Sequence, residues 1–238
     1  MGEIVLKRLM LLTMFLASFS YGKAYQISTF NEDSVTLEIC QYIMERVYQK
    51  AGHEMKIIRV PGKRSLIQAD TGKVAGELCR TRAVEKKHSN LVAVPFAVSQ
   101  IKLVAFSKKD VSKVRAIRQL SQDSLGQLRG IVITERLLMN RDSFIVGSIQ
   151  ALFKMLLLDR FDHALFLKNE GILYLQNNNL LHLINYSPVL ALLDMFHFIN
   201  KDQTELFSSI EATLSSMSKS GELDQLMLEA EQVALSKD

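Results

Sequence analysis

Short apolar runs alternate with amphipathic segments along most of this chain, and the alternation limits the folds available to it. Residues 25–30 and 55–60 are apolar and partly β-branched, as expected for strands. Between them, residues 32–51 carry apolar side chains at helical spacing and end at Gly52, a common helix stop. Parallel strands need a long crossover connection, usually a helix. The order strand, helix, strand therefore predicts an α/β fold with parallel sheets.

The same alternation continues to the C-terminus. Further strands are predicted at residues 74–79, 91–94, 101–106, 131–133, 163–167 and 181–185, and further helices at 63–70, 149–158, 170–176, 204–219 and 222–235. Residues 189–199 form one long apolar segment. We interpret this pattern as two α/β lobes, one formed by residues 25–103 plus 197–238 and the other by 104–196. Two hinge crossings, near Phe106 and Phe196, would then border a cleft where a ligand binds at the strand ends.

The N-terminus has the order of a secretory signal. Lys7 and Arg8 precede an apolar run at residues 9–19, and small and turn-forming residues follow it. The run is shorter than the roughly 20 apolar residues that normally span a bilayer. Residues 1–24 are therefore predicted to be a signal peptide, cleaved after Gly22 or after Ala24, and the mature protein is predicted to be exported.

Composition and motifs argue against several function classes. The 29 basic and 25 acidic residues nearly balance, whereas a nucleic-acid-binding protein concentrates basic residues on one face. The sequence has no nucleophile elbow, phosphate loop, zinc-protease motif or dinucleotide fingerprint. The five histidines are scattered, without metal-ligand spacing. We therefore predict a protein that is not an enzyme and that holds no cofactor or metal.

The two cysteines, Cys40 and Cys79, leave two alternatives open. An oxidising compartment permits a disulfide between them. Cys40 also shares a predicted helical face with Leu37 and Ile43, where a thiol often serves as a small apolar core group.

Motifs in both halves of the chain carry a family resemblance. They lie at residues 42–52, 59–66, 72–80, 90–95 and 104–107, and then at 128–130, 155–164 and 217–223. In this order the chain, from about Glu38 to its end, resembles the periplasmic solute-binding proteins of polar amino acid transporters, solute-binding family 3. The resemblance implies a two-lobed type II periplasmic binding protein fold and a monomer in the periplasm. It also implies a small polar solute and a membrane partner, which is an ABC transporter permease or a sensor.

The resemblance also indicates where a solute would bind in the first lobe. Family members usually carry a Thr-x-x-Arg turn after the cleft strand, and its arginine holds the ligand carboxylate. The sequence here is Arg80-Thr81-Arg82, so Arg80 or Arg82 is expected to take that part, because a guanidinium matches a carboxylate. Glu77 is expected to line the cleft beside Arg80, and the alternative for both is an ion pair with no solute contact.

Five more residues are candidates for the solute site. Lys63 and Arg64 begin a predicted helix, where cations oppose the helix dipole unless they have a use. Thr134 and Glu135 follow a predicted strand end, although Thr134 is equally suited to cap a helix. Tyr25 is a candidate aromatic wall.

Two function hypotheses follow. In the first, the protein captures a small polar solute between its lobes, for transport or sensing. In the second, it is an accessory or sensor domain for a membrane receptor and has lost amino-acid binding. Departures from the family support the second, since Leu167 stands where an acidic residue would hold the ligand ammonium. A few proteins of this fold are dehydratases that use cleft carboxylates, for which Glu77 and Glu135 would be the candidates.

Overall fold

The fold is that of a computed structural model, which describes residues 23–31 and 34–236. The predicted signal peptide lies outside the described residues except for Lys23 and Ala24. Lobe 1 contains β1 (Ala24–Phe30), α2 (Val35–Lys50), β2 (Glu54–Val60), α3 (Gly62–Asp70), β3 (Gly76–Arg80), a 3-10 helix (Arg82–Lys86), α7 (Thr204–Ser220) and α8 (Glu222–Leu235). Lobe 2 contains a 3-10 helix (Ile117–Leu120), β5 (Leu125–Leu128), α4 (Val132–Leu137), β6 (Phe144–Val146), α5 (Ile149–Leu157), β7 (His163–Leu167), α6 (Lys168–Asn177) and β8 (Asn185–Tyr186).

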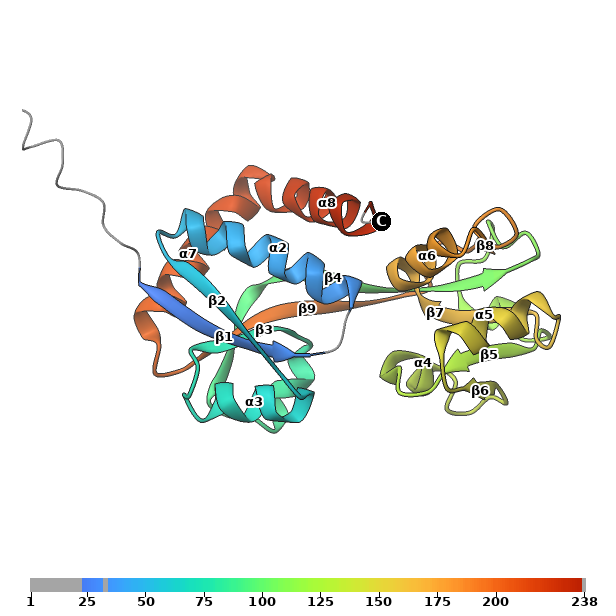
Figure 1. The fold of residues 1–238 in the computed structure, drawn as a ribbon, viewed down its shortest axis with the longest axis horizontal. Helices are drawn as coiled ribbons and strands as arrows, with labels where there is room; N and C mark the ends of the chain where they lie inside the picture. Colours follow the sequence, from blue (N-terminus) through green and yellow to red (C-terminus); the bar gives the residue numbers. More distant parts are fainter. Residues whose placement is uncertain (1–22, 32–33, 237–238) are drawn as a thin grey trace, which may run out of the picture.

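Two long strands, β4 (Leu91–Ser107) and β9 (Ala191–Asn200), join the lobes (Figure 1). They pair antiparallel, from Leu91 opposite Asn200 in lobe 1 to Leu103 opposite Ala191 at the border with lobe 2. Their register is broken between Ala93 and Ser99, around Pro95, which has no N–H to donate to the ladder. The strand order β2-β1-β3-β9-β4-β7-β5-β6 places these two strands at the centre of the sheet. The predicted α/β, two-lobed fold with two crossings is confirmed, while the lobe boundaries at residues 103 and 197 stay a prediction.

Each lobe has its own core. In lobe 1, α2, α7 and α8 cover one face of the sheet and bury Ile43, Met44 and Ile210 completely. In lobe 2, the Phe106 and Phe153 rings meet edge to face at 5.2 Å, an arrangement that adds to the burial energy. A Cβ on Gly171 of α6 would lie 2.3 Å from the Phe106 ring, so only glycine lets this helix approach the strand so closely.

The predicted strand at residues 131–133 is wrong. These residues begin helix α4. The strand that precedes this helix is β5, which starts six residues before the predicted strand. The β-branched run Ile131-Val132-Ile133 suggested a strand. The actual strand, β5, contains Gly126, so its sequence pattern did not look like that of a strand. The glycine is needed there because a Cβ would lie 2.4 Å from the Phe161 ring.

Smaller differences have the same tertiary origin. The predicted strand at 181–185 is wrong, since most of that segment is a turn and only Asn185–Tyr186 pairs with β4. The strands predicted at 91–94 and 101–106 are one strand, β4, because β9 pairs along its length. The predicted helix at 32–51 begins at Val35 among the described residues. The short edge strand β6 was not predicted.

Cys40 and Cys79 form a disulfide, with their Cα atoms 6.2 Å apart and both residues fully buried. The bridge joins the middle of α2 to β3, so both alternatives drawn from the sequence contain part of the answer: Cys40 lies in the core and is also bonded.

In the described part of the chain, no helix combines the length and hydropathy needed to cross a membrane.

Removing the disulfide is expected to destabilise lobe 1. The two cysteines are separated by 39 positions, and opening a loop of this size costs about 2–4 kcal/mol of unfolding free energy. Urea unfolding of the double variant Cys40→Ala/Cys79→Ala under oxidising conditions measures this loss. A reducing agent should lower the stability of the wild type and leave the variant unchanged. Equal stability of the two proteins under oxidising conditions would contradict the prediction.

Candidate functional site

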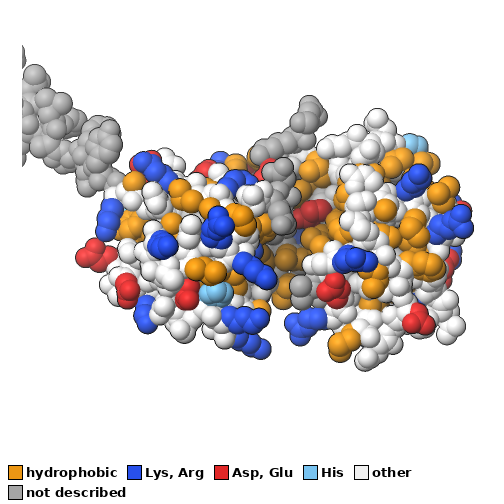
Figure 2. Space-filling view, turned by 60° about the horizontal axis from the view of Figure 1, so that its bottom comes forward, with side chains coloured by type: hydrophobic (Ala, Val, Ile, Leu, Met, Phe, Trp, Pro, Cys, Tyr) orange, Lys and Arg blue, Asp and Glu red, His pale blue; other side chains and the backbone are white. Residues whose placement is uncertain are grey.

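The carboxyl ends of the parallel strands face each other across the gap between the lobes. Phe30 and Arg80 end β1 and β3 in lobe 1, and Leu128 and Leu167 end β5 and β7 in lobe 2. Figure 1 shows the two sets of strands pointing toward one another, and Figure 2 shows the surface hollowed between the lobes. Solutes of α/β proteins bind at such strand ends, so this region is the candidate site.

A buried polar cluster forms the lobe 1 side of this region. The Glu77 carboxylate is completely inaccessible, and Ser28 Oγ donates to it at 2.7 Å. Ser65 Oγ donates at 3.2 Å from α3, and Arg80 Nε donates at 2.8 Å. The Arg80 guanidinium also donates from Nη2 to Ser65 Oγ and lies 4.3 Å above the Phe30 ring. Three elements, β1, α3 and β3, therefore fix one ion pair.

A β-bulge makes this pairing possible. In a regular strand, residues three apart point to opposite faces. Here Glu77 lies opposite Phe198 while Arg80 lies opposite Phe196, so β3 has one residue more than β9 between the two pairs. The extra residue turns Arg80 to the same side as Glu77.

Burial and charge act in opposite directions on Glu77. Loss of hydration raises the pKa of the Glu77 carboxyl, and the Arg80 guanidinium and the Ser28 and Ser65 hydroxyls oppose that rise. The Arg80 side chain is 18% exposed, so the cluster has one face open to solvent. Of the two alternatives drawn from the sequence, the ion pair is present; solute contact by Arg80 and Glu77 stays a prediction.

The other basic candidates of lobe 1 lie outside this cluster and are exposed or half exposed. Arg82 is half exposed, lies 4.5 Å above the Phe196 ring and approaches Glu85 at 3.4 Å. Lys63 and Arg64 are exposed in the first turn of α3. The cluster itself is formed without these three side chains.

Three candidates occupy places that differ from the prediction. Thr134 is fully buried inside α4, where its hydroxyl donates to the Ile131 carbonyl at 2.8 Å; Ile131, not Thr134, is the N-cap. Glu135 is exposed and accepts from the Gly130 amide at 2.7 Å, which fixes the turn before α4. Tyr25 is buried against His53 at the amino end of β1, the end opposite the cleft.

Glu170, in the first turn of α6, was missed by the sequence reasoning. Its carboxylate crosses to lobe 1, where Oε1 accepts from Thr36 Oγ1 at 2.8 Å, from the Thr36 amide at 3.3 Å and from Ser34 Oγ at 3.4 Å. The first amides of a helix lack intrahelical partners and attract negative charge. The lobe 2 carboxylate therefore caps α2 of lobe 1. The available signal was an acid three residues after a predicted strand end.

A groove of about 560 Å³ lies beside this contact, between the two lobes. Lobe 1 contributes the start of α2, and lobe 2 contributes the end of β5, the start of α5, β7 and α6. Its lining residues are Ser34, Val35, Glu38, Leu128, Ile149, Gln150, Phe166, Glu170, Leu173, Tyr174, Asn177 and Asn178. We call it the inter-lobe groove.

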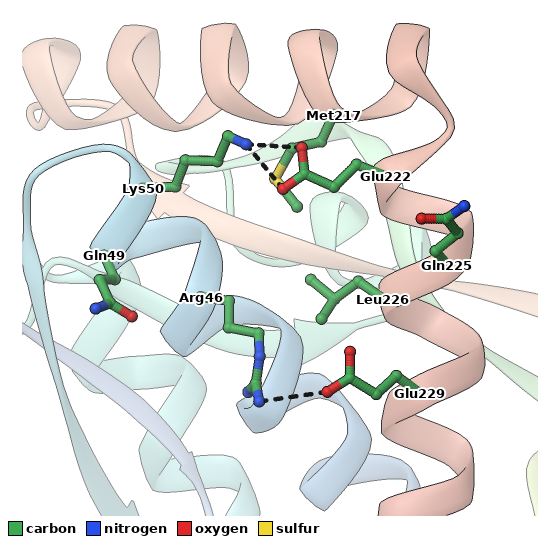
Figure 3. Close-up of a pocket in the computed structure, with 8 residues that line it drawn as sticks. All are labelled: Arg46, Gln49, Lys50, Met217, Glu222, Gln225, Leu226 and Glu229. Atoms are coloured by element: carbon green, nitrogen blue, oxygen red, sulfur yellow. Dashed lines mark hydrogen bonds and ion pairs between the residues drawn. The ribbon is translucent and has the colours of Figure 1, made fainter.

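A second groove, of about 350 Å³, lies within lobe 1 between α2 and α8 (Figure 3). Lys50 pairs there with Glu222 at 2.7 Å, and Arg46 approaches Glu229 at 3.6 Å. All four side chains are close to half exposed, so these pairs add little stability. Because its charges compensate one another and it lies away from the strand ends, it is a seam between helices rather than the candidate site.

No protein-family model and no curated protein matches the sequence. Several solved structures share the fold. An ancestral cationic amino acid solute binding protein has a TM-score of 0.64 and 13% identity, over 87% of this chain and 94% of that chain. An amino acid ABC transporter substrate-binding protein of Streptococcus pneumoniae, bound to L-arginine, has a TM-score of 0.57 and 16% identity, over 92% and 98%.

A histidine kinase sensor domain with similarity to periplasmic binding proteins gives a TM-score of 0.57 at 11% identity, over 88% of this chain and 95% of that domain. At these identities the likeness shows the fold alone. The chain thus has the two-lobed fold of periplasmic solute-binding proteins, which is used both by transporter binding proteins and by sensor domains.

Truncating Arg80 is expected to destabilise the protein through Glu77. Arg80→Ala leaves a buried carboxylate without its partner, which costs about 3 kcal/mol of unfolding free energy. In the double variant Glu77→Gln/Arg80→Ala the loss should be smaller than the sum of the single losses. Urea unfolding of all four proteins at pH 8 measures this coupling. Additive losses would show that the two side chains do not act as a pair.

Removing the Glu170 carboxylate is expected to let the lobes separate. Glu170→Ala deletes three hydrogen bonds to α2, and bonds to a charged group contribute about 1.5–3 kcal/mol each at most. Spin labels at the exposed positions Lys73 in lobe 1 and Lys154 in lobe 2, each changed to Cys, report the distance between lobes. Asp142→Ala, an exposed carboxylate of lobe 2, is the matched control. An unchanged distance distribution in Glu170→Ala would contradict the prediction.

Proposed function

We propose that this protein is an exported solute-binding protein that captures a small polar solute between its lobes, for transport or sensing. The observation that carries the proposal is the placement of charged side chains at facing strand ends. Arg80 and Glu77 lie at the end of β3 in lobe 1, and Glu170 lies just after β7 in lobe 2. A solute between the lobes would contact both sides at once, so that binding would favour the closed arrangement.

Arg80 is the proposed polar contact of lobe 1. Its bonds to Glu77 and Ser65 use Nε and Nη2, which leaves Nη1 to donate to a solute in the part of the chain that is described. Packing on Phe30 and the bond to Ser65 hold the guanidinium in place, so little side-chain entropy is lost on binding. Arg82, Lys63, Arg64 and Glu135 are proposed rim contacts.

The closed form is proposed to be recognised by a membrane partner, a permease or a sensor. β9 pairs with β3 of lobe 1, β4 pairs with β7 of lobe 2, and the two strands pair with each other, so relative lobe motion would bend these two strands. For export, cleavage after Gly22 is the better of the two predicted positions. Ala24 is the first residue of β1 and pairs with Glu54, and cleavage after Ala24 would remove it.

The alternative function is a sensor or accessory domain that has lost amino-acid binding. Two observations favour it: Arg80 is already paired with Glu77, and Glu170 already joins the lobes through groups of the chain itself. In such a domain the arrangement of the lobes would be set without a solute.

A thermal-shift screen of residues 23–238 against amino acids, small carboxylates, amines and short peptides separates the two functions. A solute that binds only the folded protein stabilises it by about 2.7 kcal/mol at a hundredfold excess over its Kd. We expect a clear rise in Tm with one chemical class. No shift with any class would reject solute binding and favour the sensor or accessory function.

A further inference from the structure

We propose that the inter-lobe groove binds an organic cation with an apolar body, and that Glu170 is its charged contact. The inference rests on the proposed solute-binding function and names the class of solute. It replaces Arg80, the polar contact proposed above, with Glu170 as the charged contact, and it differs likewise from the sequence-based expectation, which placed a ligand carboxylate on Arg80.

The lining of the groove selects for positive charge. Its twelve residues include two carboxylates, Glu38 and Glu170, and no lysine, arginine or histidine. An anionic solute would meet the like charge of Glu170 there, and no basic side chain is among the described residues that line the groove, which is unfavourable in a partly desolvated site. A cation would instead be attracted to Glu170.

The remaining lining suits an apolar body. Val35, Leu128, Ile149 and Leu173 are aliphatic, and Phe166 and Tyr174 add two aromatic rings, which attract organic cations through their electron-rich faces. A volume of about 560 Å³ falls within the range of small-molecule pockets, roughly 300–1,000 Å³. No group of three metal-ligating side chains occurs among the described residues, so a bare metal ion fits the groove less well than an organic cation.

Arg80 does not line the groove. Its guanidinium is held by Glu77 and Ser65 at the end of β3, where a nearby carboxylate already balances its charge. A solute in the groove therefore meets the Glu170 carboxylate and not the Arg80 guanidinium.

Glu170 also connects the cation site to the arrangement of the lobes. All three of its bonds to α2 end on Oε1, so in the described residues Oε2 is left for the ammonium or guanidinium of a solute. A cation on Oε2 would be held by lobe 2 while its apolar body packs on Val35 of lobe 1. Binding would then stabilise the same contact that joins the lobes.

The test uses three probes with one apolar body and different charges: 2-phenylethylamine, 2-phenylethanol and 3-phenylpropionate. Agmatine and spermidine add two further cations. Isothermal titration of each into the mature protein gives the affinities. We expect at least one of the three cations to bind, and the amine to bind at least about tenfold more tightly than the alcohol or the carboxylate.

Variants of groove residues test which side chain attracts the cation. Glu170→Gln should weaken the cation at least about tenfold, because it removes the charge of the contact and nearly preserves its shape. Because Glu170→Gln also weakens the link between the lobes, a second pair of variants changes the charge of the inter-lobe groove at Gln150 instead. Gln150 is exposed at the groove, so Gln150→Lys should weaken the cation about fivefold and Gln150→Glu should strengthen it. Gln49→Lys, in the groove between α2 and α8 (Figure 3), is the matched control and should have no effect.

The outcomes separate this inference from the proposed function. Preferential binding of 3-phenylpropionate, no binding of any cation, or cation affinity unchanged in both Glu170→Gln and Gln150→Lys would overturn the cation site. If amino acids or carboxylates still shift the Tm in the wider screen, the solute-binding function stands and only the cation class is wrong. If no solute of any class binds, both fail.

Discussion

The antiparallel pairing of β4 with β9 is the interaction on which the rest of the structure depends. These strands pair with β3 on one side and with β7 on the other, so they make a single sheet of two separately folded lobes. Each lobe has its own core, and the polar strand ends of both lie between them. The broken register around Pro95 lies on the lobe 1 side of this ladder, between Val94 and Val98 of the lobe 1 core.

The charges between the lobes are arranged in two separate sets. In lobe 1, Glu77 and Arg80 compensate each other inside a cluster closed by two serines. At the inter-lobe groove, Glu170 meets the amino end of α2, whose dipole and hydroxyls partly balance its charge. The first set pairs a cation with an anion, while the hydrogen bonds that Glu170 accepts in the described residues come from neutral hydroxyl and amide donors. This difference is the physical basis for expecting a cation in the groove rather than an anion at Arg80.

Contacts around α6 hold the lobes together on one side. Glu170 reaches α2, and Leu235 of α8 packs against both cores. On the opposite side, Figure 2 shows the hollow open to solvent. A solute in the inter-lobe groove would bind beside the contacts around α6, because Glu170, Leu173 and Tyr174 of α6 line that groove. The same arrangement suits a sensor whose lobes are fixed by its own side chains, and solute binding separates the two functions.

The sequence by itself determined the α/β class, the two lobes, the two crossings and most helices, because apolar periodicity and the glycine at position 221 are local signals. It also pointed to Glu77 and Arg80 as neighbours at a strand end. Only the tertiary structure decided their pairing, since a bulge opposite β9 turns Arg80 toward Glu77. The position of β5 was likewise mispredicted, because its glycine is required by packing against Phe161. Glu170 contacts α2 because the fold brings it to Thr36, which is 134 positions away in the sequence. Local patterns specify elements, whereas contacts between distant segments decide which side chains meet.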